Sequence, residues 1–277
     1  MKILTSLFLV SALFLTTCVS IARDTITGSG NVTTQDRSAT GFDKIENKSS
    51  INVIITKSDA FTLKVEADDN IIPYVLTEVK NNILTVRIDN DVNIKGSKKI
   101  NVYVSLPLVK SIAVMGSGNI SSNDKFGGEN IEVQVKGSGD IRFSFDGNKA
   151  SILTKGSGDI KFDGNVAHSE LGIYGSGNVQ MATQGSDADL TIRGSGNINL
   201  SGTTKAIKGV IQGSGNIEAE RFNSENAEIT IQGSGDCKLS VAQSLDVKIQ
   251  GSGDVYYTGN PGNVSCKSLG SGKVKKI

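Results

Sequence analysis

The sequence predicts an all-β protein folded as a right-handed parallel β-helix, or β solenoid, with coils of about 19 residues. Three observations predict this fold. A Gly-Ser-Gly motif recurs at a nearly constant interval, apolar and polar residues alternate on both sides of it, and 32 glycines stand beside three prolines and no tryptophan. Repeats this short are typical of stacked coils, because a single coil cannot bury its apolar face alone.

Residues 1–22 predict an export signal. Lys2 precedes an apolar run over residues 3–15, and small residues such as Ala22 occupy the positions that a signal peptidase inspects, which favours cleavage before Arg23. We therefore expect an exported protein of the periplasm, the outer membrane or the cell surface.

A lipoprotein signal is the alternative to simple cleavage. Cys18 follows the same apolar run and would then carry the lipid. The run is shorter than the roughly 20 residues that span a bilayer. Since no later segment is apolar enough to span one, we expect no transmembrane segment once the signal is removed.

Residues 23–115 predict irregular N-terminal β coils and a cap. Stretches with the composition of strands occur at 50–56, 62–66, 83–89 and 99–106, and Pro73 favours a short helical turn between them. A cap is expected because an open end of a solenoid exposes strand edges and core.

Residues 116–277 predict a regular solenoid that continues from the preceding segment. From Gly116 onward the motif recurs every 18 to 21 residues, and Asn or Asp follows it in every copy but the last. Each copy is expected to mark the same corner of its coil. The motif begins at Gly28, Gly116, Gly137, Gly156, Gly175, Gly194, Gly213, Gly233, Gly251 and Gly270.

The residues around each motif alternate with a period of two. Around Gly137, for example, Val135, Ile141 and Phe143 lie at even offsets, whereas Arg142 lies at an odd one. This is the pattern of strands with one buried face. Both glycines of the motif fall at inward positions, where a Cβ would collide with a crowded interior, and the Ser and Asn or Asp point outward. A polar return such as 146–149 is expected to close each coil.

Other repeat folds fit less well. Propeller blades need about 40 residues, leucine-rich repeats need a leucine pattern, and helical repeats need a 3.6-residue period. A sandwich of antiparallel hairpins remains an open alternative.

Charge and cysteine content limit the function classes. Removing residues 1–22 removes Lys2 and leaves 28 basic and 28 acidic side chains, so no nucleic-acid or anionic-membrane partner is expected. Cys237 and Cys266 both fall at core positions of the repeat. They could pair in an exported protein or serve as small apolar residues, and both alternatives stay open.

Several segments together resemble the head GIN domain family, adhesin-like auto-transporter proteins of Bacteroidetes. They are GFDKI at 41–45, VEADDN at 65–70, NILTV at 82–86 and the GSGN-Ile runs at 115–120 and 193–198. The resemblance implies a β solenoid, export or a lipoprotein signal, and binding at the cell surface.

The recurring Asp and Asn residues are candidates for a metal site. Asp140 with Asp159, and Asp236 with Asp254, would stack about 4.8 Å apart, where carboxylates repel unless protons or Ca²⁺ intervene. The structural alternative is that short polar side chains bond to backbone at a tight corner. That alternative needs no cofactor, and no cofactor is our main expectation.

The function predicted is that of a non-catalytic envelope or surface protein, an adhesin that presents a rigid face to a glycan or protein partner. Outward Tyr174 and Tyr256 are the candidates for stacking on sugar rings. The sequence does not indicate the oligomeric state.

The alternative function is a carbohydrate-active enzyme, a polysaccharide lyase or hydrolase, on the same scaffold. Asp163, Arg193 and Lys208 are outward charged residues available to it, and His168 has no evident partner in the sequence. These residues form no recognisable catalytic pattern, so no catalytic residue is predicted.

Overall fold

A computed structural model of the protein describes residues 23–277. The predicted signal peptide and the lipidation site at Cys18 lie outside these residues. Within the described part of the chain, no helix has the length and hydropathy needed to cross a membrane.

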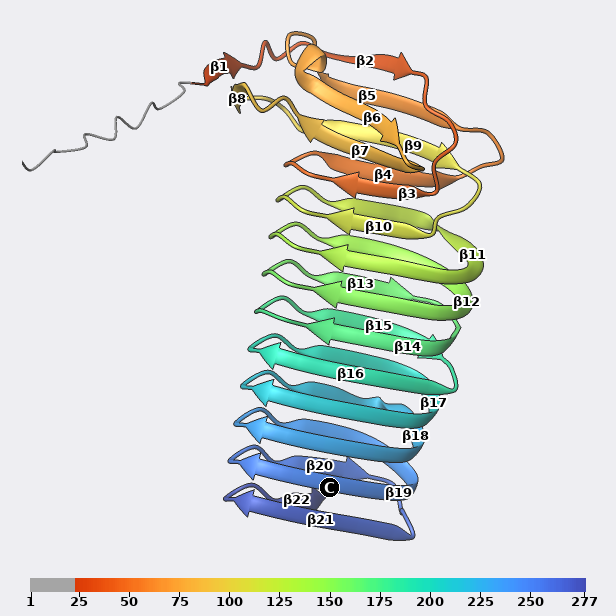
Figure 1. Ribbon diagram of the computed structural model, residues 1–277, viewed down its shortest axis with the longest axis vertical. Helices are drawn as coiled ribbons and strands as arrows, with labels where there is room; N and C mark the ends of the chain where they lie inside the picture. The colour runs from red at the N-terminus through yellow and green to blue at the C-terminus, as the bar shows by residue number, and fades with distance from the viewer. Residues whose placement is uncertain (1–22) are drawn as a thin grey trace, which may run out of the picture.

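The repeats form a parallel β solenoid of about nine turns, as predicted. In Figure 1 the near strands run from right to left and the far strands from left to right as the chain descends, which is the sense of a right-handed coil. The strands that lead into the Gly-Ser-Gly corner make one face, here called the entry face. The strands that leave the corner make the opposite one, the exit face.

Long strands bend around the side of the solenoid opposite the corner, so that one strand serves both faces of a coil (Figure 1). The expected polar return at 146–149 is therefore wrong as a loop, because the parallel ladder continues through it with Asp146 opposite Gly127. The regular part consists of β10 (Ser111–Val114), β11 (Ile120–Val135), β12 (Ile141–Thr154), β13 (Ile160–Asp163), β14 (Val166–Ile173), β15 (Val179–Gln184), β16 (Asp187–Gly194), β17 (Ile198–Gly213), β18 (Ile217–Gly233), β19 (Cys237–Gly251), β20 (Val255–Thr258), β21 (Asn263–Gly270) and β22 (Val274–Lys276).

The inward positions stack into continuous apolar columns. Ile141 pairs with Ile160, which pairs with Val179 and then with Ile198, and all four side chains are buried. Burial of aliphatic surface along such columns is the main source of stability in a repeat fold.

Unequal motif spacing is absorbed away from the corner. The 21-residue coil that begins at Gly116 carries two extra residues in a bulge between Ser121 and Lys125, where the pairing shifts from Arg142 to Ser144. A similar shift lies between Asn199 and Ser201 of β17. The corners therefore stay in register although the coils differ in length.

The corner glycines are required by the coil above. A Cβ on Gly139 would lie well under 3.0 Å from the carbonyl oxygen of Gly118, the equivalent glycine of the preceding coil. The predicted collision is thus confirmed, but the obstacle is neighbouring backbone and not interior side chains. The close approach lets the N–H of Ser138 donate to the carbonyl oxygen of Gly116 at 3.1 Å.

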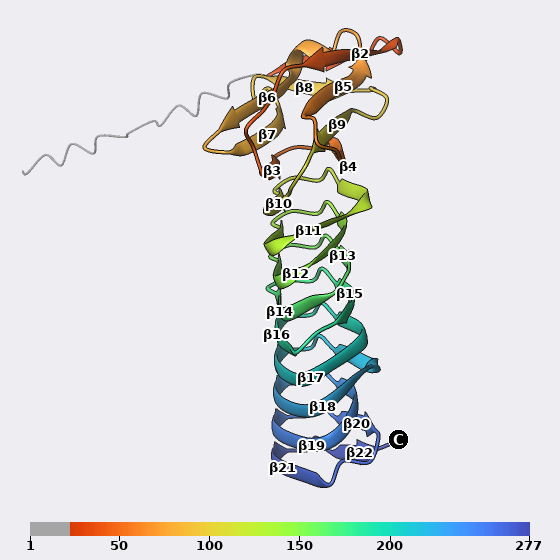
Figure 2. The same ribbon diagram turned by 90° about the vertical axis from the view of Figure 1, so that its right-hand side faces the viewer.

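The cap lies across the upper end of the stack (Figure 2) and contains all the antiparallel pairs: β2 with β5, β5 with β9, and β6 with β7. The predicted strands and the short helical turn near Pro73 are all present. The upper elements are β1 (Asp24–Thr27), β2 (Val32–Arg37), β3 (Lys44–Asn47), β4 (Asn52–Lys57), β5 (Thr62–Asp68), the 3-10 helix η1 (Ile72–Tyr74), β6 (Val75–Lys80), β7 (Ile83–Ile88), β8 (Val92–Lys95) and β9 (Asn101–Leu106).

The coils of the cap do not stack in chain order. The strands β7 and β9 lie parallel above β3 and β4, which in turn lie above β10 and β11. The chain therefore forms the second coil from the top, β3 with β4, before it forms the coil above, β7 with β9. It then continues below both at β10.

The first motif, at Gly28, does not mark a coil corner, which corrects the prediction that every copy does so. It joins β1 to β2 within the cap, where Ser29 and Asn31 donate to the carboxylate of Asp69. Glycine is needed at position 28 because a Cβ there would collide with the side chain of Asp68.

The two cysteines of the described chain are free and differ in burial. Cys237 lies in the core, as expected, whereas Cys266 is exposed. Cys266 pairs with Val247 at an inward position of β21, but β21 belongs to the last described coil and no further coil covers it.

Candidate functional site

The residue after each Gly-Ser-Gly motif forms a hydrogen-bonded ladder down the corner. Its side-chain oxygen accepts the backbone N–H of the equivalent residue in the next coil, at 2.7 to 3.0 Å over eight successive steps. In order, the rungs are Asn119, Asp140, Asp159, Asn178, Asn197, Asn216, Asp236, Asp254 and Lys273.

The ladder explains why Asn or Asp stands at this position. The neighbouring N–H groups of the corner donate to backbone carbonyls, whereas this one depends on a side-chain oxygen. Lys273 can end the series because no described coil lies below it. The structural interpretation of the Asp residues therefore has direct geometric support.

The four Asp residues suggested for Ca²⁺ all belong to this ladder. Asp140 and Asp159 occupy adjacent rungs, as do Asp236 and Asp254, so the predicted pairs are neighbours. No group of three or more His, Cys, Asp or Glu residues that could hold a metal occurs within residues 23–277. Calcium binding stays a prediction.

Asp254 has an additional partner set. Lys275 donates to its second oxygen at 2.6 Å, and the Tyr256 hydroxyl donates to the same oxygen at 3.0 Å. The bond from Lys275, followed by the backbone N–H of Lys273, lowers the pKa of Asp254 to about 2. This carboxylate is occupied by protein groups.

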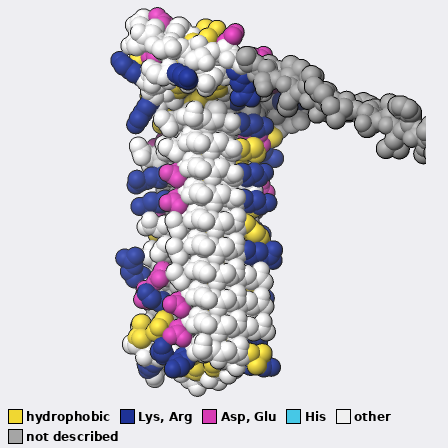
Figure 3. Space-filling model, turned by 90° about the vertical axis from the view of Figure 1, so that its left-hand side faces the viewer, with side chains coloured by type: hydrophobic (Ala, Val, Ile, Leu, Met, Phe, Trp, Pro, Cys, Tyr) yellow, Lys and Arg dark blue, Asp and Glu magenta, His cyan; other side chains and the backbone are white. Residues whose placement is uncertain are grey.

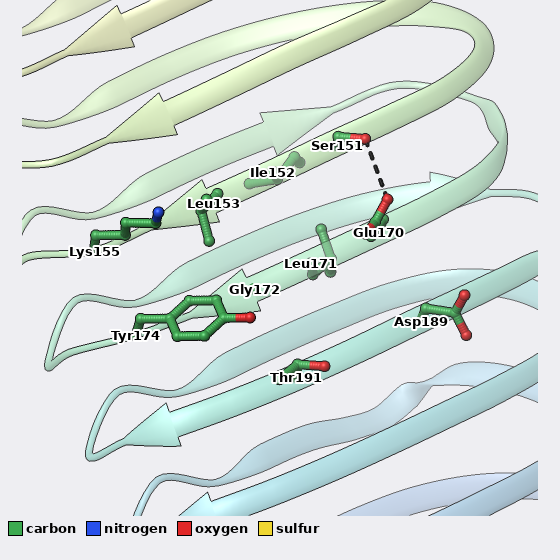
Figure 4. Close-up of a pocket in the computed structure, with 10 residues that line it drawn as sticks. All are labelled: Ser151, Ile152, Leu153, Lys155, Glu170, Leu171, Gly172, Tyr174, Asp189 and Thr191. Carbon is green, nitrogen blue, oxygen red and sulfur yellow. Dashed lines mark hydrogen bonds between the residues drawn. The ribbon is translucent and has the colours of Figure 1, made fainter.

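A hollow of about 830 Å³ opens on the entry face around Gly172 (Figure 4). Gly172 is the one residue of its outward column without a side chain, between Leu153 in the coil above and Thr191 in the coil below. The lining of the hollow combines apolar, acidic, basic and hydroxyl groups: Ser151, Ile152, Leu153, Lys155, Glu170, Leu171, Gly172, Tyr174, Asp189 and Thr191.

The missing side chain lets an aromatic ring lie along the strand. A Cβ on Gly172 would fall 2.9 Å from Leu153 Cδ1 and 3.3 Å from Tyr174 Cε2. Figure 4 shows the Tyr174 ring extending beneath Gly172. Leu153 and Tyr174 thus form an apolar platform on a face that is otherwise largely polar.

Tyr174 is 40% exposed, and the guanidinium carbon of Arg193 lies 5.2 Å from its ring centroid. Tyr256 differs: it lies on the exit face, half-buried, with the Lys275 ammonium 5.1 Å from its ring. The structure therefore does not bring the two predicted tyrosines together. Of these two predicted tyrosines, Tyr174 is the one that has an exposed ring beside a hollow.

Two of the charged groups in and near the hollow have partners on adjacent coils. Glu170 bonds to Lys149 at 2.8 Å, and that bond is the main cause of its lowered pKa. His168 has a partner after all, since its Nδ1 lies 2.7 Å from Asp187 on the next coil. Neither His168 nor Asp187 lines the hollow.

The residues named for an enzyme do not converge. Asp163 lies on β13 of the exit face, whereas Arg193 and Lys208 lie on β16 and β17 of the entry face. Outward residues of both faces share the same parity, but Asp163 follows its motif whereas Arg193 directly precedes one, and this order in the sequence separates the two faces.

A second groove, of about 870 Å³, runs down the exit face beside the ladder. It includes Tyr103, which is 38% exposed and donates to Glu66 at 2.9 Å. Sequence reasoning missed Tyr103, although its place between inward Val102 and Val104 gives its orientation. It also missed Asn52 and Asn101, which stand above the ladder and share a bond of 3.2 Å.

Fold and surface together define an elongated parallel β solenoid with two open hollows, each of which contains an exposed tyrosine ring, Tyr174 on the entry face and Tyr103 on the exit face. The profile described as "Putative auto-transporter adhesin, head GIN domain" matches residues 41–183 and 165–261. The chain belongs to the head GIN domain family, which confirms the resemblance seen in its sequence.

Solved structures share this fold. A "putative adhesin" of Parabacteroides distasonis is 22% identical, with a TM-score of 0.72 over 92% of this chain and 100% of that one. A "putative lipid binding protein" of the same species is 23% identical, with a TM-score of 0.71 and the same coverage. A "putative adhesin" of Parabacteroides merdae is 19% identical, with a TM-score of 0.71 over 92% and 99%. None of the curated proteins matches the sequence.

Proposed function

We propose that the protein is an exported, non-catalytic adhesin of the cell envelope or surface, and that it binds a glycan in the hollow around Gly172. The observation that carries this proposal is the exposed Tyr174 ring beside Leu153, surrounded by hydroxyl and charged groups. Sugar rings have an apolar face and a hydroxylated edge, and an aromatic platform with polar neighbours suits both.

Two features support binding without catalysis. A carboxylic acid that protonates a glycosidic oxygen needs a raised pKa, whereas the bond from Lys149 lowers the pKa of Glu170. The solved structures named above add support, since two of them carry the name adhesin.

The test is retention of residues 23–277 on a panel of immobilised glycans and matrix proteins, with product release assayed in parallel. We expect saturable retention on a glycan without product, and loss of most of that retention in Tyr174→Ala. The matched control is Tyr256→Ala, which should retain binding because this ring is half-buried on the exit face and does not line the hollow. Equal retention by both variants, or released oligosaccharide, would contradict the proposal.

A further inference from the structure

The outward column that contains Tyr174 changes character along the solenoid. This column is the position just before each motif. In the coils with motifs from Gly137 to Gly194, here called the upper coils, it is basic or aromatic, and in the lower coils it is mainly glutamine. In order below Met115, its members are Lys136, Lys155, Tyr174, Arg193, Gln212, Gln232, Gln250 and Leu269.

A second basic column lies on the other side of the corner. Arg142 and Lys161 pair on adjacent strands of the exit face. Figure 3, which looks onto the corner, shows basic side chains on both sides of a narrow pale strip over these coils. We call Lys136, Lys155, Arg193, Arg142 and Lys161 the corner cations.

The corner cations have no acidic partner. Within residues 23–277 none of the five lies within 4.0 Å of a carboxylate. Three lysines of the lower coils differ: Lys238 bonds to Glu218 at 3.1 Å, Lys248 to Glu228 at 3.1 Å and Lys275 to Asp254 at 2.6 Å. Other lysines of the lower coils, such as Lys208 and Lys267, have no carboxylate within 4.0 Å among residues 23–277. Like charges stacked on adjacent strands repel each other, so the upper coils favour a counter-charge from outside.

The strip between the two columns carries little negative charge. Only Asp140 and Asp159 add negative charge to its upper part, and each already accepts a backbone N–H through Oδ1. Five cations against these two carboxylates leave positive charge in excess. The adjoining hollow adds Asp189 and Glu170, of which Glu170 is paired with Lys149. The other outward side chains of the strip are exposed serines: Ser117, Ser138, Ser157, Ser176, Ser195, Ser214, Ser234, Ser252 and Ser271.

We infer that the ligand of this surface is an acidic linear polysaccharide that lies along the axis of the solenoid. Its carboxylate or sulfate groups bind Lys136, Lys155 and Arg193, and one of its sugar rings rests on Tyr174. Cations on successive coils are about 4.8 Å apart, the scale of one sugar unit in an extended chain. This inference rests on the proposed function and names its ligand class.

Two features favour a polysaccharide over other polyanions. Tyr174 interrupts the basic column and, beside the hollow at Gly172, offers a platform for a single ring, with the hydroxyl-bearing Ser151 and Thr191 in the same lining. The basic columns follow one narrow edge of a long solenoid (Figure 3), which suits a single chain and offers little contact to a flat bilayer.

The experiment compares polygalacturonate with its fully methyl-esterified form, which keeps the sugar backbone but loses the charge. Residues 23–277 are titrated against both in solution. We expect the acidic chain to bind about tenfold more tightly at low salt, and added salt to weaken it. The triple variant Lys136→Gln, Lys155→Gln, Arg193→Gln should lose about tenfold in affinity. It should still fold, because glutamine already occupies this column in the lower coils.

The matched control is Lys238→Gln, Lys248→Gln, Lys275→Gln, which removes the same charge from paired positions and should bind almost as tightly as wild type. Equal losses in both triple variants would overturn the inference, as would equal affinity for duplex DNA or anionic vesicles. If neutral glycans bind through Tyr174 while the charge variants change nothing, the acidic ligand is wrong and the proposed function survives. If no glycan binds at all, both fail.

Discussion

The upper and lower coils have the same corner backbone and different surfaces. Close contacts between the corner glycines and the coil above recur from Gly137 to Gly270, and the Asn or Asp ladder runs from Asn119 to the N–H of Lys273. Outward side chains differ, since Lys155 and Arg193 have no acidic partner while Lys238 and Lys248 are in ion pairs. The corner contacts of this scaffold therefore fix the backbone, and the outward columns are free to differ between coils and to carry function.

Corner glycines should matter equally in both halves. Gly139→Ala in an upper coil and Gly215→Ala in a lower coil both place a Cβ against the carbonyl oxygen of the preceding coil. We expect each to lower the free energy of unfolding by about 3 kcal/mol, because backbone cannot move aside as a side chain can. Urea unfolding measures this.

Gly127→Ala is the control, since its nearest atom would be 3.5 Å away, and it should change stability little. If one corner variant were tolerated, the two halves would not have equivalent corners.

The ladder supplies the next largest effect. Asn197→Ala removes the acceptor of the Asn216 N–H, which now lies at 3.0 Å. A polar group left unpaired costs about 1–3 kcal/mol, and thermal or urea unfolding would show it. Asn197→Asp keeps the oxygen and should retain most of the stability. Similar losses in both variants would mean that the oxygen is not what matters.

The two tyrosines should separate stability from binding. Tyr256→Ala loses the bond to Asp254 and the contact with Lys275, so we expect a loss of about 1 kcal/mol in unfolding free energy. Tyr174→Ala should cost less, because this side chain is more exposed than that of Tyr256, although it also loses a cation contact, with Arg193. The reverse order would contradict the division between a functional upper surface and a structural lower one.

The smallest effect concerns pH. The pKa of Asp254 is about 2 in the folded protein, below its ordinary value of 3.8, so its charge stabilises the fold above about pH 4 and this contribution is lost as the pH falls towards 2. Asp254→Asn keeps an oxygen for the Lys273 N–H but removes the charge. The stability difference between wild type and variant should therefore shrink over this range, and a constant difference would contradict the assignment.

The regular coils could be predicted because their information is local. A fixed step between motifs and a period of two around each one determine which residues point inward, and bulges absorb the exceptions. The coil order of the cap could not be predicted, since β7 and β9 stack on strands that precede them in the chain. Gly28 belongs to this irregular cap, and its motif therefore has the corner sequence without forming a coil corner.

The candidate site was predicted only in part. Tyr174 was identified from its outward parity, and the four Asp residues were identified as neighbours. The hollow was missed because Gly172 reads as an ordinary strand residue until the side chains of adjacent coils are placed around it. The sequence also did not show which cations are in ion pairs, because an ion pair depends on which side chains of adjacent coils lie close together.

The most direct test of the account is a crystal structure of residues 23–277 with a short oligogalacturonate. We expect sugar density over the Tyr174 ring, with carboxylates between Lys155 and Arg193 and the sugar chain parallel to the solenoid axis. Density on the lower coils or in the exit-face groove beside Tyr103, with the Gly172 hollow empty, would contradict it.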